Sequence, residues 1–194
     1  MSVFELYLKL GLQHIADLKG YDHILFILTL CVVYSLKEWK RVLILITAFT
    51  IGHSLTLVLA TLDLIRVDGD LIEFLIPLTI FLTALANLFA GRRSVSTLHH
   101  YLKYGAALFF GLIHGLGFSN YLRSLLGAER GLALPLFSFN VGIELGQIII
   151  VTIIMLLTKV AVDLLGMQKR EWHVMLSGAG LGISLVLMIE RYPF

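Results

Sequence analysis

Long apolar stretches, separated by short connections that carry most of the charge, run through the whole chain. Only 14% of the 194 residues are charged, against about 25% in ordinary soluble domains. A helix needs roughly 20 predominantly apolar residues to cross about 30 Å of hydrocarbon. Since several stretches approach this length, the sequence predicts an all-α, polytopic membrane helix bundle that forms a single domain over residues 1–194.

The sequence predicts six transmembrane helices preceded by one short interfacial helix. Residues 3–18 place apolar side chains at helical spacing, which is typical of an amphipathic helix at a membrane surface. The first span is short, and the interfacial helix before it would make up the difference. The expected spans are 21–36, 42–62, 71–90, 104–122, 133–158 and 173–190.

Lysine and arginine are distributed unevenly between the two sides of the predicted bundle. Nine lie at the connections that follow the first, third and fifth spans, and six lie on the opposite side. Because cytoplasmic loops carry the excess, we expect a multi-pass protein of the cell (inner) membrane with both termini extracytoplasmic. Residues 1–10 lack the compact apolar core of a cleavable signal peptide.

The charge balance also bears on partners. The net charge is only +2, and the chain has no dense basic tract, so nucleic acid is not expected as a partner. Membrane lipid is the expected surrounding, and the sequence leaves a homo-oligomer open.

Ionisable side chains occur inside these apolar stretches or at their ends. Burying such groups costs several kcal/mol unless they are paired or coordinated, so each is a candidate for function. An adjacent Asp-His pair opens the first span. The candidates are His14, Asp22, His23, His53, Glu73, His114 and Glu144, with Asn140 one helical turn before Glu144.

The candidates are expected at similar depths. At a rise of ~1.5 Å per residue, His53 lies about 18 Å from Arg41 and His114 about 16 Å from Lys103, near the membrane midplane. Glu144 is expected at a comparable depth from the other side, and the remaining candidates lie near the outer ends of their spans. The ionisable groups should therefore share one layer, from the outer mouth to the midplane.

These residue types favour a divalent transition metal. Neutral imidazoles with carboxylates suit Zn²⁺, Ni²⁺ or Fe²⁺, whereas Ca²⁺ and Mg²⁺ prefer oxygen ligands alone. Any single histidine can equally be a packed side chain bonded to a backbone carbonyl, and Glu144 alone can be a protonated bridge between helices. The shared depth and the shared residue types favour a metal site.

Two further sequence features concern packing. Glycines four residues apart allow helices to approach closely, and this spacing occurs at Gly142–Gly146 and Gly178–Gly182. The single cysteine, Cys31, is expected to be a small buried hydrophobic side chain.

Four segments resemble the signature motifs of the HupE/UreJ family. They are residues 14–26, 49–57, 110–118 and 139–147, and they keep the family's order. The resemblance implies a polytopic membrane protein associated with hydrogenase and urease operons and regarded as a nickel or cobalt permease. It also implies that His14, Asp22 and His23 handle metal in the first span and that His114 belongs to a later motif. Nickel permeases place the first histidine closer to the Asp-His pair than here, which indicates a divergent branch.

Three hypotheses follow. A transition-metal permease would capture the ion in an outward-facing funnel and hold it at a midplane site. The funnel residues would be His14, Asp22, His23 and the entry residue Glu73, and the midplane residues would be His53, His114 and Glu144.

The first alternative is an intramembrane zinc-type metallohydrolase acting on a lipid or lipid-linked substrate. In that case Glu144 would be the general base and Asn140 would anchor the oxyanion or the substrate. The polar residues end near mid-membrane, which favours the enzyme, because a permease needs a continuation to the cytoplasm. The second alternative is an accessory membrane subunit whose buried ionisable groups only lock helices together.

Overall fold

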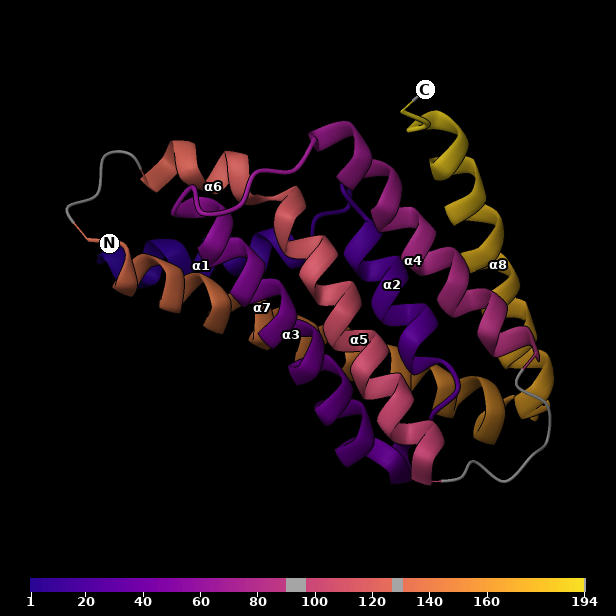
Figure 1. Cartoon of the computed structure of the whole chain (residues 1–194). Coiled ribbons are helices and arrows are strands. Elements are labelled where there is room, and N and C mark those ends of the chain that lie inside the picture. The colour runs from indigo at the N-terminus through magenta and orange to yellow at the C-terminus, as the bar shows by residue number, and fades with distance from the viewer. Residues whose placement is uncertain (90–96, 127–130, 194) are drawn as a thin grey trace.

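The computed structural model describes residues 1–89, 97–126 and 131–193 and shows a bundle of helices (Figure 1). The prediction of an all-α membrane bundle is confirmed. The helices are α1 (Val3–Ile15), α2 (Asp22–Cys31), α3 (Trp39–Thr61), α4 (Gly69–Phe89), α5 (Thr97–Gly117), α6 (Ser119–Leu126), α7 (Ala133–Lys159) and α8 (Lys169–Glu190). A 3₁₀ turn, Leu36–Glu38, precedes α3, and a π turn, Val160–Leu164, extends α7.

The prediction of six continuous spans is wrong in number. Within the described residues, four helices are long and apolar enough to cross a membrane: Leu36–Thr61, Gly69–Phe89, Ala133–Leu164 and Lys169–Glu190. α2 has only ten residues, which cover about 15 Å. It ends at Cys31, and Ser35 then begins the next helical segment in a capping box with Glu38.

The predicted fourth span, 104–122, is divided between two helices. α5 ends at Gly117 and the separate helix α6 begins at Ser119. α5 is not among the four spanning candidates, and its first turns carry His99, His100 and Lys103. The predicted interfacial helix 3–18 corresponds to α1, which begins in a capping box: Ser2 Oγ accepts from the Glu5 backbone and Glu5 Oε2 accepts from the Ser2 backbone.

α1 and α7 meet at two glycines. A Cβ on Gly11 would run into the carbonyl of Phe139, and a Cβ on Gly142 would run into the carbonyl of Leu8. Only glycine allows the two backbones to approach this closely. The contact continues one turn later, where Ile15 covers Gly146. The predicted role of the Gly142–Gly146 spacing is thus confirmed.

α3 and α5 meet in the same way. Gly52 lies against the carbonyl of Leu108, Gly111 lies against the carbonyl of Phe49, and Gly115 continues the contact against His53. Both glycine crossings join parallel helices, because the contacts advance in the same direction along each pair. His14 lies three residues after Gly11, and His53 lies one residue after Gly52. The crossings therefore fix the positions of both histidines in the bundle.

α4 and α8 run side by side in opposite directions, with α2 next to them (Figure 1). Gly180 of α8 lies against the methyl group of Thr29 in α2. The side-chain amide of Asn87 in α4 donates to the Thr29 carbonyl at 2.6 Å. The predicted packing role of Gly178 and Gly182 is wrong within this chain, since an added Cβ at either glycine would meet nothing within 4 Å.

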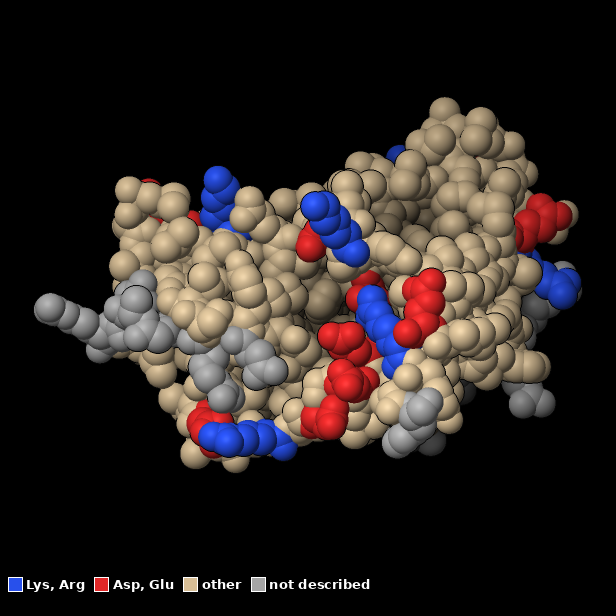
Figure 2. All heavy atoms as spheres, turned by 90° about the horizontal axis from the view of Figure 1, so that it is seen from above, with Lys and Arg blue, Asp and Glu red and all other residues tan. Residues whose placement is uncertain are grey.

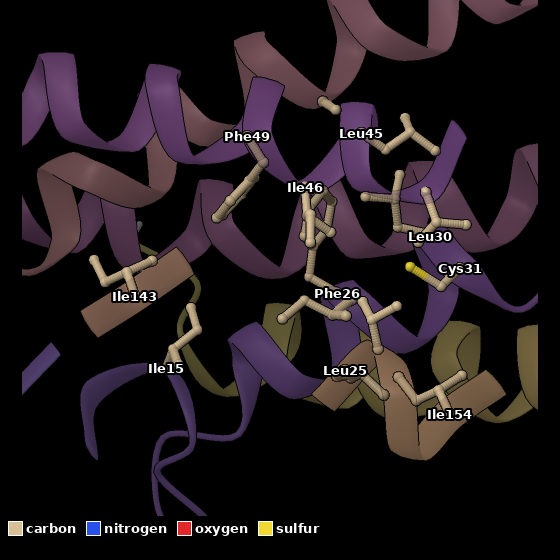
Figure 3. Close-up of a cluster of buried hydrophobic side chains, with 14 of the residues drawn as sticks. Ile15, Leu25, Phe26, Leu30, Cys31, Leu45, Ile46, Phe49, Ile143 and Ile154 are labelled. Carbon is tan, nitrogen blue, oxygen red and sulfur yellow. The ribbon is translucent and has the colours of Figure 1, made fainter. Parts of the chain in front are cut away.

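The hydrophobic core lies between α2, α3 and α7 (Figure 3). Phe26 and Phe49 pack against each other with ring centroids 4.9 Å apart. Ile46 and Leu45 of α3 and Ile154 of α7 complete this region of the core. Cys31 lies within the core and is 1% exposed, so its predicted role as a buried hydrophobic side chain is confirmed.

The connections gather at two ends of the bundle. At one end, the Lys103 ammonium lies 5.2 Å from the Tyr34 ring, which joins the start of α5 to the connection before α3. At the other end, Arg191 after α8 reaches Asp22 at the start of α2. Helices that cross a membrane in alternating directions have their connections at two opposite ends, as here. That the end with Arg191 faces the extracytoplasmic side stays a prediction.

Candidate metal centre

Three histidines from three helices converge beside the turn between α1 and α2. His14 lies in the last turn of α1, His23 in the first turn of α2 and His53 in the C-terminal half of α3. One ring nitrogen from each lies within 4.8 Å of the others. The ring centroids of His14 and His23 are 4.7 Å apart, and His53 lies 5.8 and 5.9 Å from them. We call these residues the histidine triad.

The triad carries buried nitrogens that have no hydrogen-bond partner among the described residues. They are Nε2 of His14, Nε2 of His23 and both nitrogens of His53, which is fully buried. A buried polar atom without a partner is costly, and such atoms are rare in folded proteins. Neutral imidazole nitrogens at this spacing are suitable ligands for Ni²⁺, Co²⁺, Zn²⁺ or Fe²⁺.

His14 belongs to α1, outside the four spanning helices, and its environment favours the neutral ring. Burial holds the pKa of His14 well below its ordinary value of 6.5, and the neighbouring His23, His53 and His114 lower it further. Desolvation disfavours the charged imidazolium, and each nearby imidazolium would repel another. The ring therefore offers a free lone pair at neutral pH.

His114 of α5 lies next to the triad. Its ring centroid is 5.2 Å from that of His23, and its Nε2 is 3.0 Å from Thr79 Oγ1 of α4. Thr79 gives its only proton to the Ile76 carbonyl at 2.7 Å. The hydroxyl must then accept from Nε2–H of His114, which leaves Nδ1 without a proton and without a partner in the described structure. His114 thus presents a fourth lone pair beside the triad.

A pocket of about 320 Å³ leads from the end of the bundle to these histidines. Its lining joins His14, His23 and His114 with three carboxylates and one cation: Asp17, Asp22, Glu73 and Arg191. Figure 2 shows acidic and basic side chains gathered beside a hollow on this face. The acidic side chains outnumber the single Arg191, so the pocket favours cations.

Aromatic rings close the opposite side of the site. The rings of Phe26 and Phe49 each lie 5.1 Å from the ring of His114. On the pocket side, Phe118 packs on His14 with ring centroids 3.8 Å apart and stacks on Phe139 at 5.2 Å. His14, His23 and His114 therefore line the acidic pocket, and Phe26 and Phe49 cover His114 toward the middle of the bundle.

Comparison with known families identifies the chain. A family model described as HupE / UreJ protein matches residues 1–191, nearly the whole length. The chain belongs to the HupE/UreJ family. This is a nickel/cobalt transporter-type family of membrane proteins. No curated protein and no solved structure matches the chain.

In this HupE/UreJ protein, the two candidates on α7, Glu144 and Asn140, form their hydrogen bonds with groups outside the triad. Glu144 Oε1 accepts from the Thr47 hydroxyl at 2.7 Å, and Asn140 Nδ2 donates to the Leu136 carbonyl at 2.9 Å. Thr47 is six residues before His53, which is about 9 Å along α3. The structure brings His14, His23, His53 and His114 together, and it leaves the metal-binding and catalytic roles of Glu144 and Asn140 as predictions.

The structure places the other two candidates, Asp22 and Glu73, in the pocket. Asp22 Oδ2 accepts from Arg191 at 3.1 Å, and its Oδ1 has no partner among the described atoms. Sequence reasoning missed Arg191, which was counted only as a loop charge. It also missed Thr79, although a threonine two residues after Pro77 in an apolar helix was a weak signal.

Proposed function

We propose that this HupE/UreJ protein is a permease for a divalent transition metal ion, nickel or cobalt in type, and that the histidine triad is the site where the ion binds. The observation that carries the proposal is the triad itself. Three imidazoles with buried, unpartnered nitrogens lie within ligand distance of one another, and two of them, His14 and His23, line an acidic pocket. This donor set matches the cargo of the family.

The pocket suggests how the ion would arrive. Carboxylates of Asp17, Glu73 and Asp22 would concentrate cations at the mouth and strip part of their hydration. The imidazoles of the triad would then replace water as ligands, with Nδ1 of His114 beside them. Because Phe26 and Phe49 cover the inner side, this arrangement would be a state in which the ion can enter from the pocket but cannot pass inward. This is one of the two states that alternating access needs.

Transport by purified protein in proteoliposomes tests the proposal. We expect uptake of Ni²⁺ or Co²⁺ by the wild type and a loss of at least about tenfold in His23→Ala and in His53→Ala, because each removes one ligand. His173→Ala is the matched control, since His173 lies in α8 outside the triad. If the wild type binds the metal but does not carry it across the bilayer, the permease is ruled out.

One observation favours the hydrolase alternative. A largely apolar groove of about 900 Å³ between α1, α6 and α7 also reaches His14, and its lining includes Leu10, Ile149 and Ile150. A lipid chain could approach the triad along it. The general-base role of Glu144 gains no support, because its carboxylate bonds to Thr47. The test is whether the zinc-loaded wild type releases lipid hydrolysis products. If it does, and if Glu144→Gln keeps this activity, a hydrolase with a different base would be favoured.

A further inference from the structure

Between α3 and α7, polar side chains continue from the triad away from the acidic pocket. Thr47, Thr50 and His53 follow one another at intervals of three on α3. Thr50 contacts Gln147, with Oγ1 and Oε1 2.7 Å apart, and Thr47 contacts Glu144 at the same distance. The polar contacts therefore continue for about 9 Å beyond His53 toward the α3 end that carries Lys40 and Arg41.

These groups have more hydrogen-bonding capacity than the neighbouring residues use. Gln147 is fully buried, yet its Nε2 has no partner among the described residues. Glu144 is half-buried beside the exposed Thr47, and its Oε2 is a buried atom that is also unpaired among these residues. Thr50 has one proton but two acceptors, the Ile46 carbonyl at 3.1 Å and Gln147. A half-turn of the carboxamide would give Thr50 an N–H donor and leave the Gln147 oxygen free.

Packing alone does not explain this arrangement. A carboxylate with one free oxygen in an apolar bundle costs several kcal/mol relative to water unless a cation or a proton accompanies it. The two hydroxyls, the carboxylate and the carboxamide are all oxygen donors, which suit a divalent cation but bind Ni²⁺ or Co²⁺ less firmly than imidazoles do. A weaker site after a stronger one is what allows an ion to leave.

We infer that Thr47, Thr50, Glu144 and Gln147 form a second cation site, built from oxygen donors between α3 and α7, which receives the divalent ion from the histidine triad. We call it the oxygen site. It supplies the continuation that a permease needs, toward the α3 end that carries Lys40 and Arg41. The transfer role rests on the proposed permease function, whereas the binding of a cation at the oxygen site does not.

A binding experiment tests the site without measuring transport. The full-length protein in detergent is loaded with one equivalent of Ni²⁺ to fill the triad and then titrated with Mn²⁺, which favours oxygen ligands, while electron paramagnetic resonance counts bound Mn²⁺. We expect one ion bound at the oxygen site in the wild type and in the control Glu171→Gln. Whatever the carboxylates of the acidic pocket bind, Glu144→Gln should bind one Mn²⁺ fewer than either. Absence of this ion from the wild type, or its retention in Glu144→Gln, would overturn the oxygen site.

A flux experiment tests the transfer role. Glu144→Gln keeps the side-chain shape, and the absorption spectrum of Co²⁺ bound to the triad reports that the variant is folded. We expect that spectrum to be unchanged and uptake to fall at least about tenfold, because the ion loses its weaker exit site. Unchanged uptake would overturn the transfer role. A wild type without flux would refute the permease, and the Mn²⁺ titration would still decide the oxygen site.

Discussion

Arg191, three residues from the end of the chain, donates a hydrogen bond to Asp22, the residue that precedes His23 of the triad, at 3.1 Å. The pair joins α8 to α2 at the mouth of the acidic pocket, and it neutralises one of the three carboxylates there. The C-terminal segment therefore sets the charge at the entrance to the metal site.

This relationship predicts opposite effects of two substitutions on metal uptake. Arg191→Gln leaves Asp22 unneutralised and should lower the apparent KM for Ni²⁺ by about two- to fivefold at low ionic strength, because exposed charges steer cations into the pocket. Asp22→Asn should raise KM. Both differences should shrink at high salt, and Asp163→Asn, at the other end of the bundle, should change neither. A change of KM in the same direction in both variants would show that the pair only holds α8 to α2.

The hydroxyl of Thr79 should control how His114 binds metal. Thr79→Val removes the acceptor that keeps the proton on Nε2, so Nδ1 would no longer be held as the free lone pair. We expect the affinity for Co²⁺ to fall about tenfold, a typical effect of losing a group that orients a ligand, with a changed Co²⁺ absorption spectrum. Thr79→Ser should restore both. Thr83→Val, one turn further along α4, is the control, and an equal loss there would indicate a general packing defect.

That the four histidines occupy neighbouring depths could be anticipated, although the permease hypothesis divided them between a funnel, with His14 and His23, and a midplane site, with His53 and His114. His53 lies in the C-terminal half of α3 and His114 in the last turn of α5. Counting residues along these helices gives a fair estimate of depth, and the crossing at Gly52 and Gly111 brings the two helices together. The same counting of residues placed Asp22 and Glu73 near the ends of their helices, where they line the pocket. The family resemblance agreed with this grouping and is confirmed by the match over residues 1–191.

The position of Glu144 and the number of spans could not be anticipated in this way. Counting residues assumes that a helix stands upright, whereas α7 crosses α3 obliquely (Figure 1). Glu144 consequently pairs with Thr47 and not with a histidine. The short α2 depends on where Ser35 begins the next helical segment, and the proton position on His114 depends on Thr79; neither is contained in an apolar pattern.

The glycine crossings should be sensitive to a single methyl group. Gly11→Ala and Gly52→Ala would place a Cβ against a backbone carbonyl of the facing helix, and backbone atoms cannot move aside as a flexible side chain can. We expect each to destabilise the protein by about 1–3 kcal/mol or more, measured as a lower unfolding temperature in detergent. Gly105→Ala and Gly178→Ala, where a Cβ would meet nothing within 4 Å, are the controls. Equal shifts at all four positions would contradict the crossings.

Metal affinity should depend on pH in a direction set by His14. Metal binds the neutral ring, so protons compete for it, and the pKa of His14 is held well below 6.5 mainly by burial. Competition should therefore begin only at pH values below the ordinary histidine range. We expect the Ni²⁺ affinity, measured by equilibrium dialysis from about pH 8 to about pH 5, to stay level near neutrality and to fall as the medium becomes acidic. A decline that is half complete at pH 6.5 or above would show that His14 titrates as an exposed histidine and does not lie in the buried triad.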